Sequence, residues 1–251
     1  MKKDRSMEWV EYTKVDAEIT MAKERIVSEV SLSIYVNGEQ YATAMITPMM
    51  EKEFVIGHLF ARGIIDSVDK IESIAVNDGI AEVTVSGIKE KAEQSPGIQF
   101  DFQVNKEGIF QGINTVLNSE IYAETGAIHS AGIFQEGAVP VCVTEDIGRH
   151  NALDKVIGYA LNKGIDFRNT FAVSTGRMVS EMVLKVCRAN IPIVATKAAV
   201  TKLGVEIGEE RGLTIIGYVR DRGMKISTDT DEKIATERLM KIYTHPQRVL
   251  L

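Results

Sequence analysis

The chain has 251 residues, of which 45% are hydrophobic and 25% are charged, a composition that suits one large globular domain or two small ones. Its net charge of −6 argues against a general nucleic-acid-binding protein, which usually carries a basic surplus. No apolar run is long enough to span a bilayer, and no apolar stretch follows the charged start at Met1–Arg5. The sequence therefore predicts a cytoplasmic protein with neither a nucleic-acid nor a membrane partner.

The sequence contains two cysteines, Cys142 and Cys187, and neither belongs to a CxxC pair. Cys142 lies in the apolar pattern of a strand and Cys187 in that of a helix. Cysteine in such surroundings usually behaves as a small core hydrophobe. We expect two reduced, buried thiols, although the sequence alone leaves a disulfide between them open.

The first half of the chain mixes strands and helices. Residues 30–36 and 41–45 alternate at period two around Asn37-Gly38, which predicts a β-hairpin. The other elements predicted here are a helix over 51–64 capped near Gly63, a hairpin over 71–76 and 81–85, a solvated loop over 86–105 and a helix over 106–122. We expect residues 1–121 to form an α+β domain with two hairpins.

Strands alternate with helices in the second half. The predicted strands are 133–134, 139–143, 171–173, 191–195 and 213–219, and the predicted helices are 152–161 and 178–189. This alternation favours parallel strand pairing with helices on the faces of the sheet. We expect a mixed α/β chain in which residues 122–251 form an α/β domain.

Polar segments follow the predicted strands of the second half, at 144–151, 174–177, 197 and 220–222. In open α/β sheets, ligands bind beyond the carboxyl ends of the strands, where helix N-termini carry a partial positive charge. Several strand ends therefore bring cations, hydroxyls and carboxylates to one edge. The sequence predicts a single anion-binding site there.

These residues also have structural interpretations. Ser174 and Thr175 could cap a helix that follows them directly, and Asp146 with Arg149 could form an ion pair or a capping arrangement. The remaining polar residues could be solvated or satisfied in turns: Arg220, Arg222 and His150.

The histidines do not form a metal site. A zinc-dependent nucleobase deaminase needs an H-x-E and a P-C-x-x-C motif. Neither His129 nor His150 is followed by glutamate at that spacing, and Pro140-Val141-Cys142 has no second cysteine. A nucleotide-dependent enzyme with either histidine as general base lacks a nucleophile, so we rank that function last.

The segment Glu145–Gly158 (EDIGRHNALDKVIG) is too long and particular to match a family by chance. Together with Ser174–Met182, Pro192–Ala198 and Gly217–Arg220, it closely resembles the FdhD/NarQ family of formate dehydrogenase accessory proteins. Residues 125–131 also look like the family's TGG-x-H-x-A segment, with alanine where the second glycine is usual. The resemblance is strong from about residue 122 to 225 and extends weakly through the first half, at Thr47-Pro48 and over 56–65.

The resemblance implies a cytidine-deaminase-like three-layer core over residues 122–251 and a homodimer. It also implies that the protein takes sulfur from a cysteine desulfurase and passes it to the molybdenum cofactor, bound as bis-molybdopterin guanine dinucleotide, for a formate dehydrogenase apo-enzyme. The phosphates of such a ligand suit a cationic site. The residues predicted to bind it are His129, Glu145, Asp146, Arg149, His150, Asn151, Ser174, Thr175, Gly176, Arg177, Lys197, Tyr218, Val219, Arg220, Asp221, Arg222 and Gly223.

The chain departs from the family in one loop. Members that carry sulfur have a C-G-x-C-G type loop just before the TGG segment, because a thiolate accepts the persulfide. Residues 86–121 contain no cysteine, and Gln94-Ser95-Pro96-Gly97 stands where the pair is expected. We therefore assign no catalytic residue. The alternative function is a cofactor-binding chaperone that transfers no sulfur.

Overall fold

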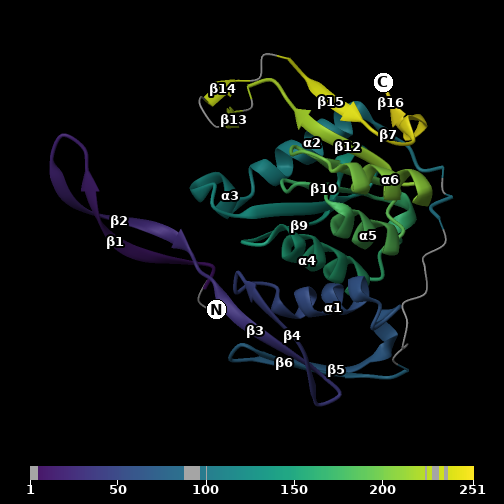
Figure 1. The fold of residues 1–251 in the computed structure, drawn as a ribbon, viewed down its shortest axis with the longest axis horizontal. Coiled ribbons are helices and arrows are strands. Elements are labelled where there is room, and N and C mark those ends of the chain that lie inside the picture. The colour runs from purple at the N-terminus through teal and green to yellow at the C-terminus, as the bar shows by residue number, and fades with distance from the viewer. Residues whose placement is uncertain (1–4, 88–96, 100, 224, 228–231, 235–236) are drawn as a thin grey trace.

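The computed structural model of the protein describes residues 5–87, 97–99, 101–223, 225–227, 232–234 and 237–251. Within these ranges the larger sheets have six and four strands, and a separate two-stranded ribbon projects from the body (Figure 1). The predicted mixed α/β class is confirmed. The likeness of the larger domain to cytidine deaminases stays a prediction.

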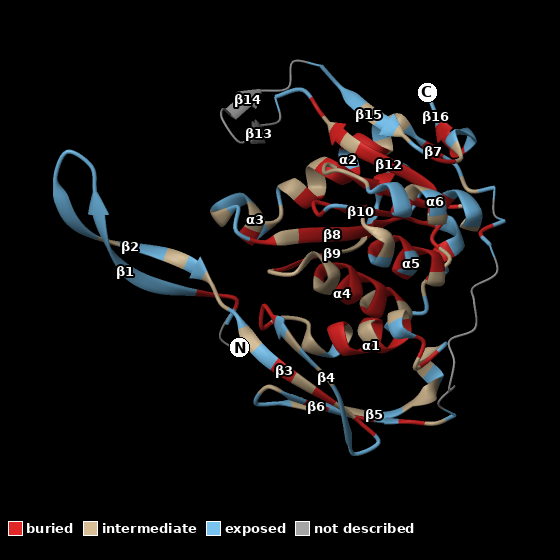
Figure 2. Ribbon diagram, in the orientation of Figure 1, coloured by how far each residue is buried: buried red, intermediate tan, exposed pale blue. Residues whose placement is uncertain are grey.

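The projecting ribbon consists of β1 (Met7–Val15) and β2 (Ile19–Val27), which pair antiparallel. Most of the ribbon is exposed (Figure 2), including large apolar side chains such as Trp9 at 69% and Ile19 at 76%. Its base is anchored where Met7 packs with Ile121 of α3 (Glu120–Thr125). No element was predicted before residue 30, because the ribbon buries almost nothing and no core-facing side distinguishes its strands.

The four-stranded sheet has the order β4-β3-β6-β5. Both hairpins predicted for the first half are confirmed, as β3 (Val30–Val36) with β4 (Glu39–Ile46) and β5 (Ile71–Asn77) with β6 (Ile80–Val85). Each turn has a left-handed backbone, with φ of 51° and 85° at Asn37 and Gly38. β3 pairs with β6 in parallel and joins the two hairpins.

Helix α1 (Glu51–Arg62) lies between this sheet and α4 (Arg149–Asn162) (Figure 1). The two helices touch through glycines. A Cβ on Gly57 would lie 1.9 Å from the carbonyl oxygen of Asp154, and one on Gly158 would lie 1.9 Å from that of Glu53. The close approach makes one continuous core from both layers.

The six-stranded sheet has the order β15-β12-β11-β10-β8-β9. Its strands are β8 (His129–Phe134), β9 (Pro140–Asp146), β10 (Phe171–Ser174), β11 (Ile193–Thr196), β12 (Thr214–Arg220) and β15 (Leu239–Ile242). β10, β11 and β12 are parallel, as predicted, whereas β8 runs antiparallel to both β9 and β10. β9 to β12 therefore end at the edge where β8 begins.

Helices cover both faces of this sheet. α2 (Lys106–Leu117) packs on one face, and α4, α5 (Ser180–Arg188) and α6 (Lys202–Arg211) pack on the other. The helix predicted over 106–122 ends earlier than expected. α2 stops at Leu117, and residues 118–119 connect it to a separate helix, α3. α6 was not predicted, since half of its ten residues are charged and two are glycine. The boundary between residues 121 and 122 stays a prediction.

The remaining described strands are short: β7 (Val104–Asn105) pairs with β16 (Val249–Leu250), and β13 (Lys225–Ser227) pairs with β14 (Glu232–Ile234). None of the described helices is both long and apolar enough to cross a membrane.

A fully buried ion pair fixes the start of α4. Lys155 Nζ lies 2.7 Å from Asp146 Oδ2, and both side chains have no exposed surface. The same ammonium donates to the carbonyls of Thr47 at 3.0 Å and Glu145 at 3.2 Å. Burial lowers the pKa of Lys155, although the carboxylate of Asp146 opposes that shift. The pair thus ties β9, α4 and the segment before α1 together.

Replacing Gly158 by alanine should destabilise the fold, because the new methyl group meets the backbone of α1 and the helices must separate. We expect a loss of about 1–3 kcal/mol in the free energy of unfolding, measured by urea denaturation. Gly108→Ala in α2 is the matched control, since its Cβ would meet the side chain of Val104 at 3.2 Å. Equal stabilities of the two variants would contradict the tight glycine contact.

Replacing Lys155 by methionine should leave the buried Asp146 carboxylate without its cation. We expect a loss of about 3–5 kcal/mol, measured in the same way. Lys163→Met, at the exposed end of α4, should change stability by less than about 0.5 kcal/mol. A Lys155→Met variant as stable as that control would show that the pair contributes nothing.

Candidate functional site

The polar strand ends meet at one edge of the six-stranded sheet. In the strand register, His129 lies opposite Asp146, Ala131 lies opposite Ser174, and Ser174 lies beside Thr196. His129 thus begins β8 at the point where the neighbouring strands end. α4 starts directly behind β9, and its first turn has neither a side-chain cap nor an acidic residue. The positive end of that helix therefore faces this edge.

The two acidic residues at the end of β9 stabilise the fold. The carboxylate of Glu145 accepts from the backbone N–H groups of Ile121 at 3.2 Å and Tyr122 at 2.6 Å and so holds the start of α3. Asp146 accepts from Gly148 N–H at 2.8 Å and pairs with Lys155. The suggested ion pair between Asp146 and Arg149 is wrong, because Lys155 occupies the carboxylate.

Asn151 and His150 have structural contacts as well. The Asn151 amide donates to the carbonyl of Met45 and to Asp146, each at 2.8 Å. His150 Nδ1 lies 3.9 Å from Glu181. Burial and then the nearby charges of Lys185 and Arg149 lower the pKa of His150.

The hydroxyl groups after β10 organise the loop. Ser174 Oγ accepts from Gly176 N–H at 3.1 Å, and Thr175 Oγ1 accepts from Ser130 N–H at 2.9 Å. Thr196 Oγ1 donates to the carbonyl of Gly176 at 2.7 Å. The expectation that Ser174-Thr175 leads straight into a helix is wrong, since α5 begins only at Ser180. These hydroxyls stabilise the turn and cap no helix.

Four cations of this edge have no acidic partner in the described part of the chain. Within the described residues, no carboxylate forms an ion pair with Arg149, Arg177, Lys197 or Arg222, which we call the cationic cluster. Arg149 Nε is buried without a hydrogen-bond acceptor. A Cβ on Gly176 would lie 2.6 Å from the Arg149 Cβ, so glycine lets the arginine lie against this loop. The cluster is therefore short of negative charge.

His129 lies within this positive field. Its Nδ1 is 3.5 Å from Thr175 Oγ1. Burial and the charges of Arg149, Lys197 and Arg177 lower its pKa, and the carboxylate of Asp146 opposes that shift only partly. The imidazole is therefore neutral near pH 7, and its N–H group can donate a hydrogen bond to an anionic ligand.

The end of β12 carries the segment Tyr218–Gly223. A bulge separates Gly217 from Arg220 in the pairing with β15, and Tyr218 takes a left-handed φ of 52°. Arg220 and Lys241 both lie over the Tyr218 ring, at 5.8 and 4.7 Å from its centre. Val219 is buried in the core. Of this segment, Arg222 and Gly223 are the residues exposed to solvent.

Asp221 of the same segment serves to fix its surroundings. Its carboxylate accepts from Asn114 Nδ2 at 2.7 Å, Arg222 N–H at 2.8 Å and Arg238 Nε at 2.6 Å. Burial pushes the pKa of Asp221 upward, but these hydrogen bonds outweigh it and hold the pKa below its usual value. Asp221 is therefore ionised and anchored to α2.

A cavity of about 520 Å³ opens beside the cationic cluster, lined by Asn114, Leu117, Asn118, Tyr122, Ala123, Lys197, Arg222 and Gly223. Sequence reasoning missed Tyr122, whose hydroxyl accepts from Lys197 and whose ring centre lies 4.8 Å from the lysine Nζ. Its place just before the Thr125–Ala131 segment was the available signal.

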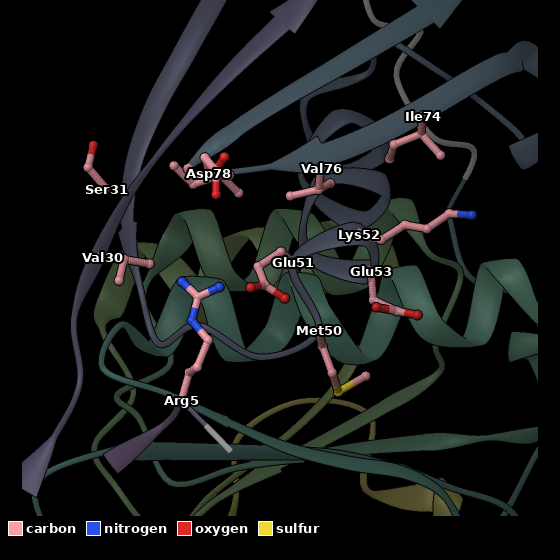
Figure 3. Close-up of a pocket in the computed structure, with 12 residues that line it drawn as sticks. Arg5, Val30, Ser31, Met50, Glu51, Lys52, Glu53, Ile74, Val76 and Asp78 are labelled. Carbon is pink, nitrogen blue, oxygen red and sulfur yellow. The ribbon is translucent and has the colours of Figure 1, made fainter. Parts of the chain in front are cut away.

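A second cavity, of about 710 Å³, lies between the four-stranded sheet and the start of α1 (Figure 3). In Figure 3 the side chains of Arg5 and Glu51 point toward one another across it. It shares no residue with the predicted site. We therefore place the candidate site at the strand ends.

Both cysteines are thiols, and both lie away from the cluster. Cys142 lies in the first half of β9 and Cys187 near the far end of α5. Burial raises the pKa of each to about 12, with a further contribution from Glu53 at Cys142. A thiol with so high a pKa is a poor nucleophile at neutral pH.

Comparisons with known proteins agree with the motifs. The model of the FdhD/NarQ family matches residues 27–97 and 79–250. The sulfur carrier protein FdhD of Methanothermobacter thermautotrophicus is 31% identical over 96% of this chain and 98% of its own, and that of Wolinella succinogenes is 29% identical over 90% and 88%. The crystal structure of a candidate formate dehydrogenase accessory protein from Desulfotalea psychrophila has a TM-score of 0.79 at 25% identity and covers 97% of this chain and 99% of its own. The chain belongs to the FdhD/NarQ family.

Proposed function

We propose that this protein is an accessory factor in the maturation of formate dehydrogenase, and that its cationic cluster binds the molybdenum cofactor as bis-molybdopterin guanine dinucleotide and supports its sulfuration. The names of the relatives supply the accessory role. Its partners are then a cysteine desulfurase and the formate dehydrogenase apo-enzyme, and its working form is a cytoplasmic homodimer.

One observation carries the binding part of this proposal. At the end of β9 both acids have partners within the fold, whereas no carboxylate of the described residues pairs with Arg149, Arg177, Lys197 or Arg222. A ligand with several phosphates supplies the missing anions, and the start of α4 adds backbone N–H groups. The buried Arg149 Nε without an acceptor fits such a ligand.

A second candidate is a chaperone that holds the cofactor without transferring sulfur. The high pKa of Cys142 and Cys187 and their distance from the cluster favour it. The relatives' name, sulfur carrier protein, favours transfer. Because neither thiol is activated, we propose that in the first case the desulfurase passes its persulfide sulfur directly to the cofactor held on this chain, and that in the second case no sulfur is passed at all.

Arg177→Ala should weaken the binding of GDP, used as a probe for the dinucleotide. Loss of one charge-assisted hydrogen bond costs about 1.5–3 kcal/mol of binding free energy, measured by titration calorimetry. Arg168→Ala is the control, because Arg168 precedes β10 at the opposite end of that strand. Unchanged affinity in the Arg177 variant would remove this side chain from the site.

Incubation with a persulfide-loaded cysteine desulfurase should leave the intact mass of the protein unchanged. The reason is that neither thiol is ionised at neutral pH. A relative that has the C-G-x-C-G loop serves as the positive control for sulfur loading. A stable gain of one sulfur atom that disappears in Cys142→Ser or Cys187→Ser would contradict the proposal.

A further inference from the structure

The C-terminal end of α2 brings two amide side chains to the cavity beside the cationic cluster. Asn114 and Asn118 line the cavity that contains Lys197 and Arg222. They also line a neighbouring groove of about 570 Å³ with Gln111. The two asparagines lie four residues apart, so they are neighbours on one face of the helix. They thus link the cations to a polar surface.

The orientation of both amides is fixed. A carboxylate only accepts hydrogen bonds, so Asn114 turns its Nδ2 toward Asp221 at 2.7 Å. Asn118 Nδ2 donates to the carbonyl of Asn114 at 2.9 Å. Each amide therefore commits its nitrogen to the protein. No described group donates to either Oδ1 atom, so both are available as acceptors.

Two fixed hydrogen-bond acceptors beside a phosphate-binding cluster favour a ligand whose ring has two adjacent N–H donors on one edge. The 2-amino-4-oxo-pyrimidine edge carries adjacent N–H donors, at the ring nitrogen and the amino group. Guanine and pterin rings share this edge. Adenine offers one amino donor next to an acceptor nitrogen, and hypoxanthine lacks the amino group. Asparagine oxygens therefore match the shared edge better than they match either of these rings.

We propose that the Asn114 and Asn118 side-chain oxygens accept hydrogen bonds from a 2-amino-4-oxo-pyrimidine edge whose phosphate lies on the cationic cluster. This inference rests on the proposed function and deepens it. Asp221 acts as a positioning residue, because its carboxylate accepts from Asn114 Nδ2 and leaves Asn114 Oδ1 without a donor among the described residues. Specificity for the ring thus comes from α2, and affinity for the phosphate comes from the strand ends.

The test compares GDP with IDP, which lacks only the amino group, by titration calorimetry. For the unaltered protein we expect GDP to bind roughly 3- to 10-fold more tightly, the effect of one hydrogen bond. Asn114→Ala and Asn118→Ala should each weaken GDP binding and bring the GDP:IDP ratio close to one. Asn118 is exposed, so its variant should keep the fold, which a thermal melt verifies.

Gln111→Ala is the matched control, an amide on the same helix that does not line the cavity with Lys197. It should keep both the GDP affinity and the ratio. A pterin phosphate separates the two ring sources. If GDP and IDP bind equally but the pterin phosphate loses affinity in both asparagine variants, the edge belongs to the pterin.

The inference is overturned if GDP and IDP bind equally and the pterin phosphate is also insensitive to both asparagines. It is equally overturned if the GDP preference survives in both variants. A titration with pyrophosphate, which has no ring, separates failure of this inference from failure of the proposed function. If the unaltered protein binds neither pyrophosphate nor GDP, the cationic cluster itself is not a phosphate site.

Discussion

The buried pair between Lys155 and Asp146 is the interaction on which the rest of the structure depends. It joins the end of β9 and the second turn of α4 to the carbonyl of Thr47, which lies 108 residues before Lys155 in the sequence. Two buried charges are costly unless every hydrogen-bonding group is satisfied. Here the ammonium has three oxygen partners, and the carboxylate also accepts from Gly148, Asn151 and Thr47. These contacts hold the turn at Ile147-Gly148 in place, directly before Arg149 at the start of α4.

The partners of the acidic side chains also explain why the strand-end edge is positively charged. Glu145 accepts hydrogen bonds from the start of α3, and Asp146 pairs with the buried Lys155. The neighbouring cations of the cluster pair with no carboxylate among the described residues. An overall acidic chain thus presents a locally positive surface, which net charge alone does not reveal.

Much of the architecture could be predicted from the sequence, because local patterns encode it. The Asn37-Gly38 turn needs left-handed backbone, and the alternation around it marks the hairpin. The exposed ribbon could not be predicted, since it buries almost nothing that would impose a pattern. Site roles were harder, because they depend on distant partners. Asp146 has Arg149 nearby in sequence, yet its cation is Lys155 and its further donor is Thr47. Asn114 gave no signal, since its partner Asp221 lies across the fold.

The make-up of the strand-end edge has a consequence for folding kinetics. The edge combines the start of β8 with the ends of four other strands, from His129 to Arg220. β8 and β9 pair locally, whereas the parallel pairs β10–β11 and β11–β12 need crossover connections, and such non-local contacts form late and slowly. No fragment of the sheet contains the complete edge. A ligand held there would bind only the native state and would draw the folding equilibrium toward it by mass action.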